Sequence, residues 1–288
     1  MTSRTTFARA ALFTAVASLM LAAPAGAQVW RTVAASRQLR DTNAVSARVD
    51  YAAGRLELKP AAGGVLYRAN VRYDADRAEP VARFDAASRV LSLGVHLRGT
   101  GFSSMSDQHD AGSMRAELSG AVPMDLSLDL GAVEAELQLG GLRLTDLSLR
   151  SGAADVAVRF DRPNLERLRT MTLQVGAAQV KMYDAANSGV SRINAEIGAG
   201  ALTIDLGGVL VRDVDITATL AVGGLTLNVA PADGVFVDER SLLGGFDKEG
   251  FVKRTDGWYS ANYDSAARHV RIHLHAFVGG LTLTRIQR

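Results

Sequence analysis

The segment Ala221-Val-Gly-Gly-Leu-Thr-Leu227 returns near the end of the chain as Phe277-Val-Gly-Gly-Leu-Thr-Leu283. Four earlier blocks of the same length follow the same plan, in which small residues precede an alternating run; they span residues 131–137, 152–158, 176–182 and 198–204. The starting positions are regularly spaced in the low twenties up to Ala221, and the last interval, to Phe277, is more than twice as long. A period in the low twenties is typical of a solenoid whose turns each contribute strands.

Each block combines a tight turn with a strand. Glycine at the turn accepts a positive φ without a Cβ clash. The run Leu202-Thr-Ile204-Asp-Leu206 then alternates apolar and polar residues, as does Val214-Asp-Ile216 before the next turn. Alternation with period two predicts strands with one buried face and one solvent face. We therefore predict an all-β protein, a parallel-type β-solenoid with rungs of about 22 residues, in which Ile204 and Leu227 point inward.

The competing fold is an antiparallel sandwich or barrel, which needs regular hairpin turns. Only Asp233-Gly234 and Asp256-Gly257 have the sequence of such turns, and both lie in the long last interval. The sparseness of hairpin turns favours the solenoid.

The chain divides into three predicted parts. Residues 1–27 form a leader, residues 28–110 form an N-terminal strand-rich part of related design, and residues 111–288 hold the repeats. The N-terminal part contains Gly54-Arg-Leu-Glu-Leu58, which has the same turn-then-alternation pattern. An aromatic insert at about 231–264 accounts for the long last interval.

The leader is typical of a secretory signal peptide. Arg4 and Arg9 give it a positive start, an uncharged apolar run follows, and Ala25-Gly26-Ala27 ends it. Small residues at these positions predict cleavage after Ala27. The alternative, an uncleaved anchor, needs about 20 apolar residues to span a bilayer, and this run is shorter. We expect a mature chain without a transmembrane segment, in the periplasm or secreted.

Charge and cysteine content exclude several classes of function. The leader contributes two arginines and no acid, so the mature chain carries 30 basic and 30 acidic side chains. A neutral chain lacks the positive field that drives nucleic-acid binding. The sequence contains no cysteine, which excludes disulfides, thiol nucleophiles and cysteine-ligated metals.

The pattern as a whole resembles the toast-rack and LiaF-like group of bacterial extracytoplasmic proteins. The resemblance rests on Leu56-Glu-Leu58 after Tyr51-Ala-Ala-Gly54, on Tyr67-Arg-Ala-Asn-Val-Arg-Tyr73, on the glycine-turned repeats, and on Gly257-Trp-Tyr-Ser-Ala-Asn-Tyr263 leading into the last repeat. It implies a β-solenoid-like fold, a role in some relatives in the response to cell-envelope stress, and no catalytic residues. LiaF-like proteins have N-terminal membrane helices, which the mature chain lacks.

Two sets of polar residues are candidate sites of chemistry. His273 and His275 share one face of a strand, at about 7 Å spacing, and are weak candidates for metal ligands. Paired carboxylates support glycoside cleavage in some proteins. The pairs here are Asp125 with Asp129, Glu134 with Glu136, and Asp213 with Asp215. All these residues alternate with apolar ones, as outward positions of ordinary strands do, so we predict no catalytic residue, metal or cofactor.

The insert carries the candidate ligand or partner surface. Aromatic and arginine side chains dominate binding hot spots and stack on sugar rings. The candidates are Phe246, Phe251, Arg254, Trp258, Tyr259 and Tyr263. The same residues would also suit a flap or cap over the end of the solenoid, and the two roles can coexist.

These observations predict a non-enzymatic extracytoplasmic binding or scaffold module linked to cell-envelope maintenance or stress response. Its partner would be an envelope protein or polysaccharide. Two alternatives stay open: a carbohydrate-active β-solenoid enzyme using outward carboxylates, and an adhesin or self-assembling structural protein.

Overall fold

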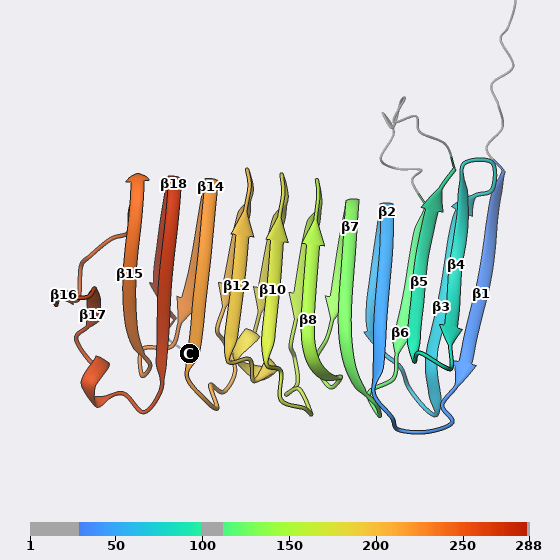
Figure 1. Cartoon of the computed structure of the whole chain (residues 1–288), viewed down its shortest axis with the longest axis horizontal. Coiled ribbons are helices and arrows are strands. Elements are labelled where there is room, and N and C mark those ends of the chain that lie inside the picture. Colours follow the sequence, from blue (N-terminus) through green and yellow to red (C-terminus); the bar gives the residue numbers. More distant parts are fainter. Residues whose placement is uncertain (1–28, 99–111, 287–288) are drawn as a thin grey trace, which may run out of the picture.

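The structure is a computed structural model that describes residues 29–98 and 112–286. Its strands join into one continuous 18-stranded sheet that winds into an elongated stack (Figure 1). The only helical turns in the described part are two short 3-10 helices, η2 (Ala185–Ser188) and η3 (Tyr263–Ser265). The prediction of an all-β protein is confirmed. The predicted leader lies outside the described residues, and so does most of Gly99–Ser113, a polar stretch rich in Ser, Gly and Asp that precedes the repeats.

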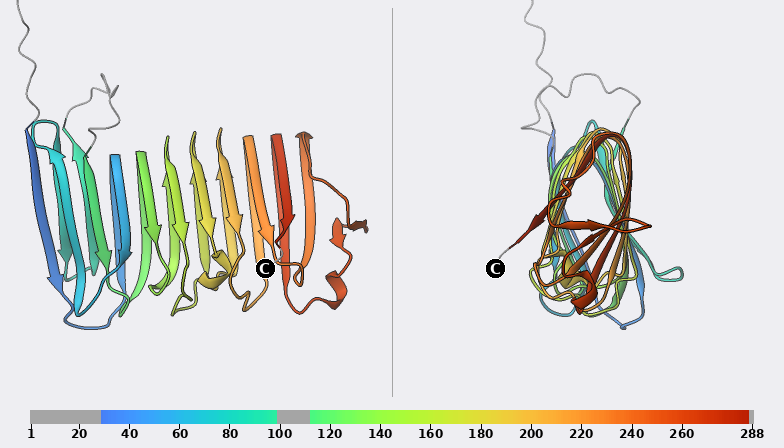
Figure 2. Two further views of the ribbon diagram at one scale, coloured as in Figure 1. Left: turned by 180° about the vertical axis from the view of Figure 1, so that it is seen from behind. Right: turned by 90° about the vertical axis from the view of Figure 1, so that its left-hand side faces the viewer.

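Long strands bend near their middle and so contribute to two facing sheets. They are β2 (Val45–Pro60), β7 (Pro123–Gln138), β14 (Val214–Val229) and β18 (His269–Arg285). Between β7 and β14 each turn of the chain uses two shorter strands instead. These pairs are β8 (Arg143–Ser151) with β9 (Asp155–Arg159), β10 (Thr170–Val175) with β11 (Gln179–Tyr183), and β12 (Arg192–Ile197) with β13 (Ala201–Asp205). The end-on view in Figure 2 shows the two sheets facing each other.

Successive turns pair in parallel and in the register that the sequence period predicts. Met171 lies opposite Leu147 on one side and Ile193 on the other, and Ile193 lies opposite Ile216. The same spacing holds on the second sheet, where Ile204 lies between Met182 and Leu227. Equivalent residues therefore stack directly on one another along the molecule.

The hydrophobic core fills the space between the two sheets. Ile204 and Leu227 are completely buried, which confirms the inward positions predicted for them. Thr203 and Thr226, between the buried positions, face outward and are half-buried. Burial of stacked Leu, Val, Ile and Met side chains is the main stabilising contribution in such a stack.

The N-terminal end departs from a plain parallel coil. Strand β2 pairs in parallel with β7 and, on its other side, with β5 and β6, so one sheet runs through the predicted boundary at residue 110. Beyond it the pairing is antiparallel, β4 with β5 on one face and β1 with β3 and β3 with β6 on the other. These strands are β1 (Trp30–Gln38), β3 (Val65–Asp74), β4 (Ala78–Asp85), β5 (Val90–Leu97) and β6 (Ser113–Leu118).

The C-terminal end explains the long last interval of the repeat. Strand β18 pairs with β14 over its whole length, with Val214 opposite Val270 and Leu227 opposite Leu283. The chain between them first builds β15 (Gly234–Leu243), which lies on the far side of β18 and parallel to it. Strands β16 (Phe251–Lys253) and β17 (Trp258–Ser260) follow before the chain returns (Figure 1). The insert is thus the end of the stack.

Glycine is required where neighbouring bends touch. At Gly279, φ is +128° and an added Cβ would lie 1.8 Å from the carbonyl oxygen of Gly223. Gly223 itself has φ +147°, and its Cβ would lie 2.1 Å from the oxygen of Gly200. Side chains cannot occupy these positions without separating the strands.

Candidate functional site

The six candidates for the ligand or partner surface all lie at the C-terminal end of the stack, in a region we term the end cap (residues 231–264). Strand β15 extends the sheet beyond β18, and β16 and β17 form an antiparallel hairpin in which Val252 lies opposite Tyr259. Strand β17 also pairs with the start of β15 through Phe236 and Val237. The hairpin thereby holds its aromatic residues against the last turns of the stack.

Three of the six candidates form an inner group that closes the core. Phe246 is buried, and Phe251 and Trp258 are partly buried and pack against the core. The rings of Phe251 and Trp258 meet Phe246 edge to face, with centroids 5.4 and 6.3 Å away. The ammonium groups of Lys248 and Lys253 lie 5.1 and 5.2 Å from the Trp258 ring centroid. These contacts stabilise the end of the stack and leave part of the indole in contact with solvent.

The other three candidates form an outer group on the surface. The rings of Tyr259 and Tyr263 meet edge to face at 4.8 Å, and Phe236 lies 4.9 Å from Tyr259. The guanidinium of Arg254 lies over the Tyr259 ring at 4.3 Å. His269 continues the row, 4.5 Å from Tyr263. The tyrosine rings are half-buried, so part of each aromatic surface is accessible.

Charges in the outer group are balanced. The Arg254 guanidinium donates hydrogen bonds of 3.0 and 2.5 Å to the two oxygens of Asp264, and this contact lowers the pKa of that carboxyl. The Tyr259 hydroxyl donates to Asp256 at 2.8 Å, which raises the pKa of the tyrosine. With its ions paired, the group offers ring faces and hydroxyls, which suit a ligand with hydroxyl groups and flat apolar faces.

The two histidine candidates do not belong to a metal-binding cluster. His273 and His275 both project outward from β18. Nδ1 of His273 lies 3.6 Å from Asp238, and its ring meets Phe236 edge to face at 5.7 Å. Within residues 29–98 and 112–286, no three His, Asp or Glu side chains gather closely enough to hold a metal ion.

Three of the six paired carboxylates are held by arginines. Arg271 donates to Asp215 at 2.6 Å and to Asp213 at 3.1 Å. Burial alone would raise the pKa of Asp213, but the backbone N–H of His269 and the Arg271 guanidinium hold it below its ordinary value. Glu134 is paired with Arg55 at 2.8 Å.

Asp125 has a different neighbour from the one predicted. It lies opposite Asp146 on the adjacent strand. Burial, and after it the charge of Asp146, raises the pKa of Asp125. The like-charged pair of Asp125 and Asp146 thus results from the register between neighbouring turns. The spacing of residues within one strand does not reveal it.

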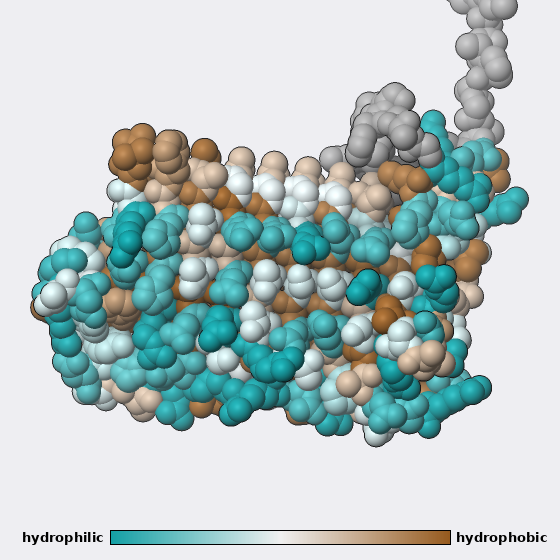
Figure 3. Space-filling model, viewed as in Figure 1, coloured by the Kyte–Doolittle hydropathy of each residue, from teal (hydrophilic) through white to brown (hydrophobic). Residues whose placement is uncertain are grey.

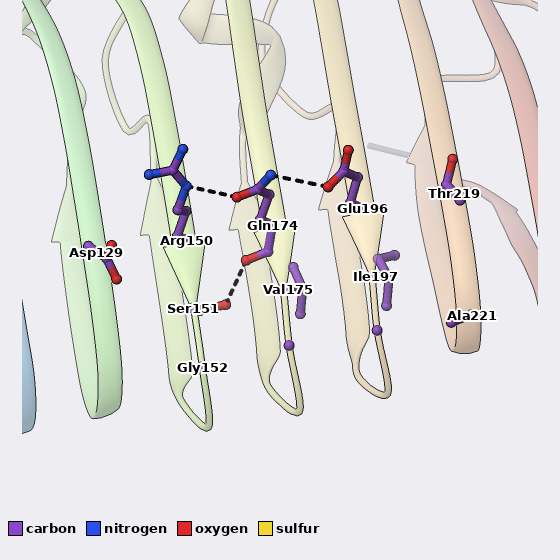
Figure 4. A pocket seen from close by; sticks show the side chains of 12 residues that line it. Asp129, Arg150, Ser151, Gly152, Gln174, Val175, Glu196, Ile197, Thr219 and Ala221 are labelled. Carbon is purple, nitrogen blue, oxygen red and sulfur yellow. Dashed lines mark hydrogen bonds between the residues drawn. The ribbon is translucent and has the colours of Figure 1, made fainter.

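Sequence reasoning missed a shallow groove beside the bends of β7 to β14 (Figure 4). Arg150 donates to the Gln174 amide oxygen at 2.8 Å, and the Gln174 amide donates to Glu196 at 3.1 Å. Asp129 and Thr219 continue this row, and Gly152, Gly176 and Gly198 leave the wall beside it bare. The signal was present in the sequence, because these residues recur at the repeat spacing.

The groove has an unfavourable geometry for glycoside hydrolysis. Asp129 and Glu196 are its carboxylates, and three strand spacings separate them in the ladder. At about 4.8 Å per spacing their backbones are roughly 14 Å apart. Glycoside hydrolases place their two carboxyl groups about 5–9.5 Å apart.

Comparison with protein families identifies one that matches this chain. A family model described as the N-terminal domain of toast_rack, DUF2154, matches residues 27–183, more than half of the 288-residue chain. No curated protein matches the chain. Among the described residues, no helix is both long and apolar enough to cross a membrane.

Three solved structures have a similar course of the chain. One is a candidate cell adhesion protein from Clostridium sporogenes, 12% identical, with a TM-score of 0.45 over 90% of this chain and 100% of that one. The second is a candidate adhesin from Bacteroides fragilis, 10% identical, with a TM-score of 0.43 over 88% and 97%. The third is a candidate adhesin from Parabacteroides distasonis, 10% identical, with a TM-score of 0.39 over 88% and 97%.

Proposed function

The chain belongs to the toast-rack family, and on that premise we propose that it is a non-enzymatic binding or scaffold module that acts outside the cytoplasm. The leader ending at Ala27 supports export. The parallel register of the central turns supports a β-solenoid, and its rigidity suits a scaffold. We assign the repeats and the end cap to the C-terminal part, residues 111–288, and strands β1 to β5 to the N-terminal part, residues 28–110.

The observation that carries the proposal is the outer aromatic group of the end cap. Tyr259 and Tyr263 present partly accessible rings that meet edge to face, and Arg254 is held on the Tyr259 ring by Asp264. Aromatic rings that are fixed before binding lose little entropy when a ligand stacks on them. We propose an envelope polysaccharide as the ligand, because sugar rings combine apolar faces with hydroxyls that Tyr and charged groups can bind.

A binding assay with matched variants tests this assignment. Chain 28–288 is titrated with peptidoglycan fragments and envelope polysaccharides, beside a Tyr259→Ala/Tyr263→Ala variant. The control is Tyr183→Ala, because Arg159 lies over the Tyr183 ring at 4.1 Å in the same kind of contact, but in the middle of the stack. We expect saturable binding that the double variant loses and the control keeps.

Melting curves of the three proteins report whether the fold is intact. If saturable binding is equal in all three folded proteins, the ligand site lies elsewhere and the outer group is structural. If none of them binds any polysaccharide, the ligand class is wrong, and an envelope protein becomes the partner to seek.

Self-assembly is a second candidate, favoured by unpaired strand edges. Among the described strands, β1 pairs only with β3 and β4 pairs only with β5. Such edges can template pairing with another chain. Pro80 lies within β4, however, and proline blunts an edge because it lacks an N–H. Gel filtration over a range of concentrations separates an assembling protein from a monomeric binder.

A further inference from the structure

The bends of the stack change character at the C-terminal end. In four successive turns the two residues at the bend are Gly and Ala, at positions 131–132, 152–153, 176–177 and 198–199. The next turn has Ala221-Val222, and β18 has Phe277-Val278 at the same place. Strand β15 ends with Leu242-Leu243 in register with them, since Leu243 lies opposite Val278.

The larger side chains are not needed to form the bend. Four turns make the same bend with Gly-Ala and keep the same parallel register. Phe277 is 63% exposed, Leu242 66%, Leu243 62% and Val222 52%. Packing within the protein therefore does not account for these four apolar residues.

Together with Val278, the exposed residues form one continuous ridge, which we term the apolar ridge (Val222, Leu242, Leu243, Phe277 and Val278). Leu243, Val278 and Val222 form one row across three neighbouring strands, and Leu242 and Phe277 form the row beside it. Figure 3 shows the ridge as the brown group that protrudes at the upper left, above the ends of β14, β15 and β18.

Glycines flank the ridge on one side, and polar residues with one ion pair flank it on the other. Toward the second sheet its neighbours are glycines, Gly223 and Gly224 on β14 and Gly279 and Gly280 on β18. On the first sheet the next outward residues are Thr219, His275 and Arg240 in register. The Arg240 side chain is 72% exposed and forms an ion pair with Asp238 at 3.9 Å.

We propose that the apolar ridge docks the protein on a lipid surface. Five apolar side chains are far fewer than the roughly 20–30 residues that each partner contributes to a stable protein interface, which argues against a second copy as the occupant. A convex ridge of Phe, Leu and Val can instead enter the boundary between lipid headgroups and acyl chains. Docking at this edge leaves the outer aromatic group of the end cap free for its own ligand.

Vesicle flotation tests the proposal. Chain 28–288, which contains every described strand, is mixed with phosphatidylcholine vesicles that do or do not contain phosphatidylglycerol. The ridge variant is Leu242→Ser/Leu243→Ser/Phe277→Ser. The control variant is Leu165→Ser/Val209→Ser/Val211→Ser, which removes apolar side chains that are equally exposed (64%, 70% and 53%) in loops at the opposite edge.

We expect the parent and the control variant to float with both kinds of vesicle, and the ridge variant to lose about ten-fold or more in partitioning. Flotation that is the same with and without phosphatidylglycerol would support apolar contact as the cause of binding. Equal flotation of the ridge variant would overturn the proposal, as would failure of the parent to float with either vesicle. A dimer of the parent that the ridge variant loses would identify a second copy as the occupant and would also overturn it.

Discussion

The inward ladder of the stack makes a quantitative prediction for Ile204→Ala. Ile204 is fully buried, with Met182 and Leu227 as its partners on the neighbouring strands. The substitution removes three carbon groups, which at about 0.8 kcal/mol each amounts to about 2.4 kcal/mol of lost transfer free energy.

A rigid site adds the free energy of the cavity. A cavity of about two water volumes, roughly 60 Å³, adds about 1.4 kcal/mol at 24 cal/mol per Å³. Stacked strands on both sides restrict collapse, so we expect a total loss of about 4 kcal/mol, within the usual range of about 2–5 kcal/mol for such truncations.

Urea unfolding followed by circular dichroism measures this loss. With an m-value of about 3 kcal/mol per M, the midpoint should fall by about 1.3 M. Thr203→Ala is the matched control, because Thr203 is the adjacent residue and faces outward between Lys181 and Thr226. It should change stability by less than about 1 kcal/mol. An unchanged midpoint for Ile204→Ala, with a large loss for Thr203→Ala, would show that the inward and outward faces are reversed.

Three further predictions concern the bend, the carboxyl of Asp125 and the leader. Gly279→Ala should destabilise the fold by roughly 1–3 kcal/mol or more, because φ is +128° and the new Cβ would overlap the Gly223 oxygen. Gly224→Ala is the control and should be tolerated, because nothing lies within 4 Å of its added Cβ. Equal melting temperatures for the two variants would contradict the tight bend. Because burial and Asp146 raise the pKa of Asp125, the folded state holds that proton more tightly than the unfolded state, and the ionised form is destabilising. Asp125→Asn should therefore raise the urea midpoint slightly at pH 7, and the gain should shrink as pH falls through the pKa of Asp125; a gain that does not depend on pH would refute this cause. Intact-mass measurement of the exported protein should show Gln28 at the N-terminus, whereas a retained leader would contradict cleavage after Ala27.

The repeating part of the fold was predictable because its signal is local. Apolar positions that recur once per period identify the partners in each ladder, as Met171 with Ile193 illustrates. Glycine marks the bend, and the alternation of apolar and polar residues on either side of it shows which side chains face inward and which face outward. Ile204 and Leu227 could therefore be placed in the core from the sequence pattern alone.

The two ends could not be predicted in the same way. Nothing periodic in the sequence indicates that β18 lies between β14 and β15, because this order depends on pairings such as Val214 with Val270, more than two periods apart. At the other end, antiparallel pairing of β3 with β6 joins segments on either side of the polar stretch. Both arrangements depend on long-range strand pairings that occur once and do not recur with the period of the sequence.

The aromatic insert was recognised as a unit, but its division into two groups was not. Composition alone does not show that Phe246 is buried whereas Tyr259 and Tyr263 are accessible. That division follows from the hairpin of β16 and β17, which brings Phe251 and Trp258 to the end of the core. The groove and the apolar ridge were missed for a related reason, since each is formed by equivalent positions of several turns.

Tryptophan fluorescence gives the most direct test of the end cap as the ligand site. The sequence contains two tryptophans, Trp30 in β1 and Trp258 in β17, so a Trp30→Phe variant reports on the end cap alone. Titration with envelope polysaccharide should give a saturable change in Trp258 emission, with the same dissociation constant as direct binding. Saturable binding that leaves Trp258 emission unchanged would contradict the account and would place the ligand elsewhere on the stack.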